Sequence, residues 1–129
     1  MAAPTKSAKK KIKKQFETGK VFIRALYNNT IVTLTDPEGH VLAWSSPGAN
    51  GFKGARQSTP YAGQVSAEMV AEKAHAFGMK SVDVYVKGMG AGRDQTIRGL
   101  MNGGLDITSI SDRTRVPHGG CRSPRQRKT

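Results

Sequence analysis

A glycine-rich segment followed by an arginine is the first candidate for chemistry in this sequence. Residues 88–92 read Gly-Met-Gly-Ala-Gly, and Arg93 follows directly. Glycines between a strand and a helix let a backbone approach a phosphate closely, and the start of a helix presents free N–H groups. The segment therefore predicts either a phosphate contact, which Arg93 would strengthen, or a tight strand-to-helix connection without a ligand.

A nucleotide cofactor is a weaker interpretation of the same glycines. Asp106 follows Gly88 at a spacing that mimics the ribose-binding acid of a dinucleotide site. The glycines, however, are spaced G-x-G-x-G rather than G-x-G-x-x-G, and the chain has no second mononucleotide-binding half. We therefore predict no cofactor and no small-molecule substrate, and we favour a backbone contact with RNA.

A second basic loop lies before the first expected helix. Residues 51–58 combine Lys53, Arg56 and Ser58 with small residues, a composition that fits phosphate contacts. The alternative is an ordinary solvated loop in which Phe52 packs into the core. One basic loop alone does not decide between them.

The sequence gives little support for a metal site or for a catalytic nucleophile. The histidines are far apart in the sequence and Cys121 is the single cysteine, so no zinc-ligand spacing exists and we predict no metal site. His118 near Cys121 lacks an orienting third group, which favours an RNA-facing tail over catalysis. A metal-dependent nuclease would need converging carboxylates, but the expected first strand has none, and Asp83 and Asp106 lie on different strands without an evident third partner. We predict that the protein is not an enzyme.

The charge of the chain is concentrated at its two ends. The formal net charge is +12, from 21 Lys and Arg against 9 Asp and Glu, and neither residues 1–14 nor residues 113–129 contain an acid. This predicts a basic N-terminal arm (1–14), a formally neutral core domain (15–112) and a basic C-terminal tail (113–129) that together grip a polyanion. The candidate RNA-binding residues in the arms are Lys9, Lys10, Lys11, Lys13, Lys14, Arg113, Arg115, His118, Arg122, Arg125, Arg127 and Lys128.

The neutral middle predicts an α/β fold with a mixed five-stranded sheet. Hydrophobic alternation, β-branched residues and turn signals give the order β-β-β-α-β-α-β, with helices on the faces of the sheet. The expected strands are 20–27, 30–35, 41–45, 81–86 and 105–111, and the expected helices begin at Thr59-Pro60 and span about 93–102.

Local signals refine this pattern. Asn28-Asn29 predicts a tight hairpin turn, since asparagine tolerates positive φ, and residues 36–39 (Asp-Pro-Glu-Gly) predict a second turn. The first helix is expected to bury a face formed by positions 62, 65, 69, 70, 74 and 77. Phe22 and Trp44 are expected in the core, as are Ile97, Leu100 and Met101 of the second helix.

A single cysteine and the absence of a long apolar run predict a cytoplasmic protein without a membrane segment.

Several multi-residue motifs occur together in a specific order. They are Asn-Asn-Thr-Ile-Val-Thr at 28–33, Gly-Phe-Lys-Gly at 51–54, Ser-Thr-Pro-Tyr-Ala at 58–62, the loop at 88–93, and Val-Pro-His with Gly-Cys-Arg at 116–122. In this order they resemble the small-subunit ribosomal protein family S11, of bacterial or organellar type, over about residues 19–122.

This resemblance implies a ribonuclease-H-like fold without nuclease activity. It implies a structural protein on the platform of the small ribosomal subunit that bridges helices of 16S-type rRNA. Neighbouring platform proteins and the mRNA near the Shine–Dalgarno cleft would be further partners. By position, Asn28, Asn29, residues 51–58, Arg93 and the tail would face rRNA. A ribonuclease-H-like nuclease and a nonspecific nucleic-acid chaperone are the alternatives.

Overall fold

The computed structural model describes residues 16–51, 53–54 and 59–127. Among them lie five strands, two α-helices and one short 3-10 helix, η2 (Pro47–Asn50). The strands are β1 (Thr18–Ala25), β2 (Thr30–Thr35), β3 (Val41–Ser45), β4 (Ser81–Gly88) and β5 (Asp106–Asp112), and the helices are α2 (Pro60–Ala76) and α3 (Arg93–Asn102). Strands β2 and β3 and helix α3 have the bounds expected from the sequence.

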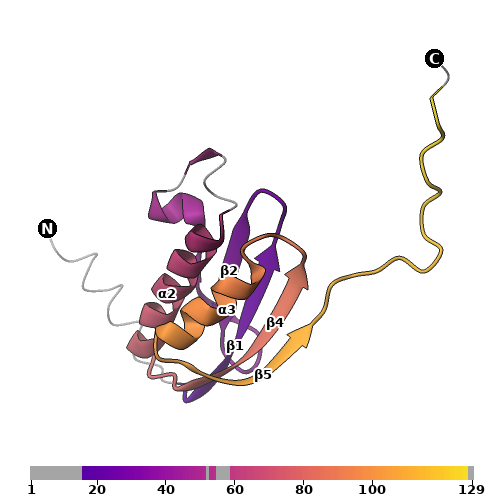
Figure 1. The fold of residues 1–129 in the computed structure, drawn as a ribbon. Coiled ribbons are helices and arrows are strands. Elements are labelled where there is room, and N and C mark those ends of the chain that lie inside the picture. Colours follow the sequence, from indigo (N-terminus) through magenta and orange to yellow (C-terminus); the bar gives the residue numbers. More distant parts are fainter. Residues whose placement is uncertain (1–15, 52, 55–58, 128–129) are drawn as a thin grey trace, which may run out of the picture.

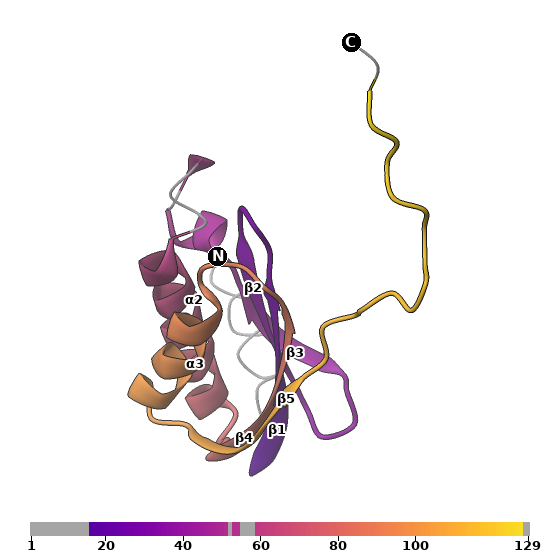
Figure 2. The same cartoon turned by 45° about the vertical axis from the view of Figure 1, so that its right-hand side comes forward.

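The strands form one mixed sheet in the order β3-β2-β1-β4-β5. Strands β1, β2 and β3 pair in antiparallel fashion, whereas β1–β4 and β4–β5 are parallel, as the β-α-β pattern predicts. Helices α2 and α3 pack on one face of this sheet, and no helix of the described residues lies on the opposite face, which we call the helix-free face (Figures 1 and 2). The expectation of helices on both faces is therefore wrong, because α2 and α3 pack side by side.

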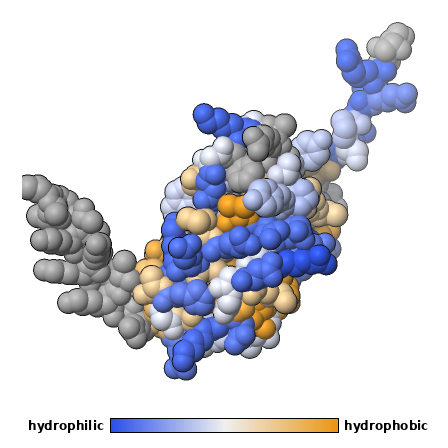
Figure 3. Space-filling model, turned by 60° about the vertical axis from the view of Figure 1, so that its left-hand side comes forward, coloured by the Kyte–Doolittle hydropathy of each residue, from blue (hydrophilic) through white to orange (hydrophobic). Residues whose placement is uncertain are grey.

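The core lies between the helices and one side of the sheet. Alternate residues of the central strands are fully buried there, including Val21, Val32 and Val84. Such alternation is what a half-covered sheet requires. On the surface seen in Figure 3, hydrophilic residues separate small hydrophobic patches.

The buried face of α2 agrees with the prediction at Ala62, Val70 and Ala74 and differs from it at the other expected positions. It consists mainly of small residues: Ala62, Gly63, Ser66, Ala67, Val70, Ala71 and Ala74. Met69 is 37% exposed, and Val65 and Phe77 are only partly buried. The reason is close packing of the two helices, since a Cβ on Gly99 of α3 would lie 2.7 Å from the carbonyl oxygen of Gln64.

The predicted cap and both predicted turns are present, and β1 and β2 form the expected hairpin around Asn28-Asn29. Thr59 caps α2 by accepting a hydrogen bond from the Ala62 N–H at 3.2 Å, and the Gly39 N–H donates to the Asp36 carbonyl at 3.0 Å. The Asn28-Asn29 turn does not use positive φ, since every residue with positive φ in the described ranges is a glycine. The Leu26 N–H donates to the Asn29 carbonyl at 2.7 Å and closes the hairpin next to the Ala25–Thr30 pair.

Some expected core residues are exposed. Trp44 is 55% and Met101 57% exposed, whereas Leu100 is fully buried and Ile97 is partly buried. Phe22 is partly buried on the helix-free face. Trp44 is exposed because it also belongs to that face, where Thr33 pairs with both Trp44 and Phe22. Met101 lies outside the buried face of α3, which consists of Thr96, Gly99 and Leu100.

Candidate nucleic-acid interface

The C-terminal segment begins as a continuation of the sheet. The Arg113 N–H donates to the Val86 carbonyl at 2.7 Å, and the Thr114 hydroxyl accepts from the Gly88 N–H at 3.0 Å. The Arg113 guanidinium lies 4.2 Å from the centre of the Tyr85 ring, a favourable cation–π contact. The first residues of the cationic tail are thus attached to β4.

Asp112 secures this attachment. Its carboxylate accepts hydrogen bonds from the Thr114 hydroxyl at 2.6 Å and N–H at 3.0 Å, and from Arg93 at 2.5 Å. The hydrogen bond from the Thr114 hydroxyl, followed by that from Arg93, holds the pKa of Asp112 well below its ordinary value. The carboxylate therefore stays ionised, which keeps the end of β5, the start of the tail and Arg93 together.

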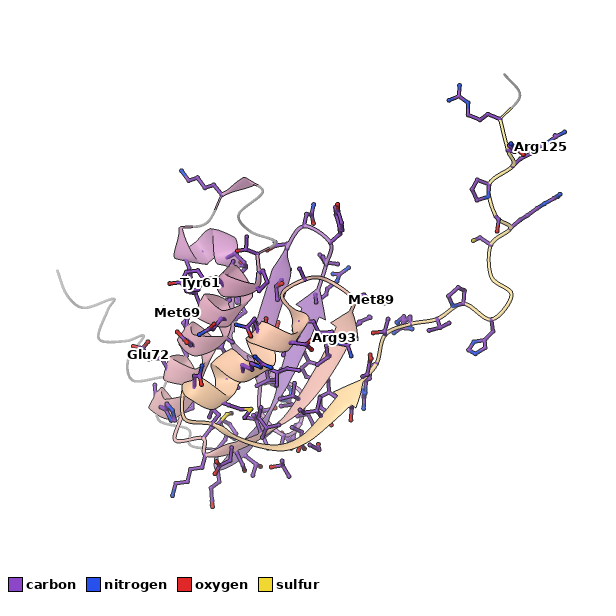
Figure 4. The ribbon with its side chains drawn as sticks, in the orientation of Figure 1. Tyr61, Met69, Glu72, Met89, Arg93 and Arg125 are labelled. Atoms are coloured by element: carbon purple, nitrogen blue, oxygen red, sulfur yellow. The ribbon has the colours of Figure 1, made fainter. Side chains whose placement is uncertain are left out.

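Beyond Arg115 the tail leaves the globular part. Figure 1 shows residues 116–127 as an extended segment that projects away from the sheet, and Figure 4 places Arg125 far along it. All residues from Arg115 to Arg127 are exposed, and none of them forms an ion pair with another described residue. These predicted site residues are Arg115, His118, Arg122, Arg125 and Arg127; Lys128 lies outside the described residues.

Arg93 occupies a different environment. Its guanidinium donates to the Gly88 carbonyl at 3.0 Å as well as to Asp112 (Figure 4). The side chain therefore closes the loop between β4 and α3 onto the end of β5. The sequence pointed to Arg93 as a phosphate contact, and the structure shows it engaged within the protein.

The glycine loop is explained by packing against β1. A Cβ on Gly88 would lie 2.2 Å from the Ala25 carbonyl oxygen, and one on Gly90 would lie 2.2 Å from that of Leu26. The Gly90 N–H is already bonded to the Ala25 carbonyl at 3.1 Å. Asp106 pairs with Ser81 at the other end of β4, so it does not approach this loop. The tight-connection interpretation accounts for these glycines, and the geometry excludes a dinucleotide site formed with Asp106.

The other predicted loop residues lie at the surface where described. Asn28 is exposed, whereas the Asn29 side chain accepts a hydrogen bond from the Thr30 N–H at 2.8 Å. Lys53 is exposed and is followed by Gly54 with φ +58°. The remaining candidates, Lys9, Lys10, Lys11, Lys13, Lys14, Arg56 and Ser58, lie outside the described residues.

One group of potential metal ligands occurs in the described part of the chain. Asp36, Glu38 and His40 lie together at the turn between β2 and β3. Burial of Asp36 acts to raise the pKa of its carboxyl group. Hydrogen bonds from the backbone N–H groups of His40 and Glu38, together with the charge of His40, outweigh this effect and lower the pKa below its ordinary value. Its carboxylate thus serves the turn. Asp83 accepts a hydrogen bond from Ser109 and does not belong to this group.

The comparison with protein families agrees with the fold and the charge distribution. The family model described as Ribosomal protein S11 matches residues 19–128. The chain therefore belongs to the ribosomal protein S11 family. It is a structural protein of the small ribosomal subunit that binds rRNA and has ribosomal neighbours, and the family is non-enzymatic. None of the described helices is long and apolar enough to span a membrane.

Proposed function

We propose that this protein bridges separate helices of 16S-type rRNA on the platform of the small subunit. In this proposal it adjoins other platform proteins, helps to form the Shine–Dalgarno cleft for mRNA, and acts in the cytoplasm. Its mixed sheet with two helices would be a ribonuclease-H-like fold that lacks nuclease activity. Residues 15–112 form the core in this account, and residues 1–14 and 113–129 are its RNA-binding arms.

The observation that carries the proposal is the exposed cationic tail. Residues 116–127 contain Arg122, Arg125 and Arg127 and no acid, and they project from the sheet instead of packing on it (Figure 1). A stretch of this kind buries no apolar surface, so its contribution comes from neutralising phosphates and releasing counterions. A tail that reaches away from a neutral core contacts one RNA helix while the core contacts another.

The loops supply the second part of the interface. Asn28 and Lys53 are exposed at the surface of the core, and Arg56 and Ser58 follow in the same basic loop. We propose that these residues and the lysine arm contact rRNA backbone. Arg93 contributes by holding the loop and the root of the tail in place, since its guanidinium already bonds to Gly88 and Asp112.

A salt titration of binding to a small-subunit rRNA transcript tests this function. If the arms and loops contact about eight phosphates, log K falls with log salt at a slope of roughly −6 to −7. A slope near zero would contradict the proposal. Equal affinity for duplex DNA would instead indicate a nonspecific nucleic-acid chaperone, and metal-dependent cleavage of the transcript would indicate a nuclease.

A further inference from the structure

The helix-free face of the sheet carries an aromatic row that the function above does not use. Thr33 pairs with both Trp44 and Phe22, and Phe22 pairs with Tyr85. Paired residues of neighbouring strands point to the same side of a sheet, so the three aromatic side chains lie in one row across four strands. The rings of Phe22 and Tyr85 stack with their centres 5.1 Å apart.

A row of cations runs beside the aromatic row. Arg24 pairs with Lys87, and Arg113 continues the row where it bonds to β4. These residues line a surface hollow of about 630 Å³ together with Phe22, Tyr85 and Arg115. The Lys20 ammonium lies 5.9 Å from the centre of the Tyr85 ring, on the other side of the aromatic row.

The charge of this surface, which we call the helix-free hollow, is complementary to a polyanion. Arg24, Lys87, Arg113 and Arg115 all line it, and no acid among the described residues does. Asp83 lies on the same side of the sheet and accepts a hydrogen bond from Ser109. Asp112 bonds to Thr114 at the edge of the hollow, and its charge is paired with that of Arg93. Residues 1–14 carry six lysines and no acid, so charge repulsion opposes their binding in the hollow.

We propose that the helix-free hollow binds one strand of RNA. Arg24, Lys87 and Arg113 hold successive parts of its phosphate backbone, and the aromatic row contacts sugar and base. The Tyr85 ring is already stacked on Phe22 and contacted by Arg113, so it contributes to the hollow mainly as a contact surface for sugar. The hollow is continuous with the root of the tail, which supports RNA over an acidic protein segment. The inference rests on the proposed function and adds a third RNA-binding surface to it.

Two double variants with equal loss of charge test the inference. Arg24→Gln with Lys87→Gln changes the hollow, and Lys80→Gln with Arg98→Gln removes two exposed cations that do not line it. Binding to a small-subunit rRNA transcript is measured from 50 to 300 mM KCl, roughly the range in which phosphate contacts dominate. Circular dichroism melting verifies that each variant folds.

The expected results follow from counterion release. Loss of two single-strand phosphate contacts makes the salt slope shallower by about 1.4 and weakens binding about 20-fold at ~0.1 M salt. The control pair weakens binding less than about threefold, through screened long-range charge alone. Equal losses for the two pairs, with tight binding by the unchanged protein, would overturn the inference and leave the proposed function intact. Failure of the unchanged protein to bind the transcript would overturn both.

A crosslinking experiment identifies the occupant in the assembled particle. The Tyr85→benzoylphenylalanine variant is incorporated into small subunits and irradiated. Crosslinks to rRNA support the inference, whereas crosslinks only to another ribosomal protein would overturn it in favour of an acidic protein segment.

Discussion

The two halves of the C-terminal cationic segment use their charges differently. At its root, Arg113 lies against the Tyr85 ring and Thr114 bonds to Asp112 and Gly88, so the chain there is part of the sheet. Further along, Arg122 and Arg125 are exposed and have no ion pair within the described part of the chain. The folded part of the chain therefore ends near Thr114, and the cations beyond it are available to another molecule.

The largest effect expected from this difference is that of deleting residues 116–129. The deletion removes Arg122, Arg125, Arg127 and Lys128. If each neutralises one phosphate, the affinity for rRNA falls about a thousandfold at ~0.1 M salt, and the free energy of unfolding changes by less than about 0.5 kcal/mol. Filter binding and thermal melting measure the two quantities. A large loss of stability would show that the projecting half packs as structure.

The converse change weakens the core and leaves the tail intact. Leu100 is fully buried, so Leu100→Ala is expected to lower the free energy of unfolding by about 3 kcal/mol. The neighbouring Met101 is 57% exposed, and Met101→Ala serves as the matched control with a loss below about 1 kcal/mol. Urea unfolding distinguishes them. Under conditions in which both variants are folded, they are expected to bind rRNA with the affinity of the unchanged protein. A loss of affinity in Leu100→Ala alone would contradict the conclusion that the core and the tail act independently.

The glycine loop tests whether its glycines serve packing. Gly90→Ala places a methyl group against the Leu26 carbonyl and is expected to cost about 1–3 kcal/mol of stability. Ala91→Ser, at an exposed position in the same loop, is the control and should be almost neutral. Urea unfolding measures both changes. An unchanged stability combined with weaker RNA binding would instead favour a direct phosphate contact by the loop.

The smallest effect is expected at the root of the tail. Because the pKa of Asp112 is lowered in the folded protein, its ionised form stabilises the fold at pH values above its ordinary pKa. Asp112→Asn should therefore lower the melting temperature slightly at pH 5–7, roughly the range in which the unfolded carboxyl is also ionised. The difference from the unchanged protein should shrink as the pH falls below about 4. A difference that is independent of pH down to about pH 2 would contradict this role of the carboxylate.

Most of the fold could be predicted from local sequence signals. The β-branched run at Thr30–Thr35, the turn that follows, and the Thr59-Pro60 cap each act within a few residues, so the sequence alone identifies them. The apolar spacing predicts the buried face of α2 correctly at Ala62, Val70 and Ala74 but not at the larger Val65, Met69 and Phe77. Close helix packing instead selects alanine and glycine, and that selection depends on where α3 lies.

The candidate interface was predictable only where it depends on charge. Acid-free termini are visible in the sequence, and the exposed tail arginines agree with that pattern. The Arg93–Asp112 pair joins residues far apart in the chain and depends on the parallel arrangement of β4 and β5. The row formed by Trp44, Phe22 and Tyr85 likewise requires the register of four strands, which no local signal specifies.

Chemical modification of arginines within assembled small subunits tests the central claim most directly. Phenylglyoxal labelling followed by mass spectrometry measures the reactivity of each arginine of this protein. The measurement is made in intact small subunits and again after high salt has released the protein from the rRNA. We predict that Arg122, Arg125 and Arg127 are protected in the intact particle and become reactive after the rRNA contacts are removed. Equal reactivity of these three arginines in both states would contradict the account, because the projecting tail would then lie in solvent and contact no RNA.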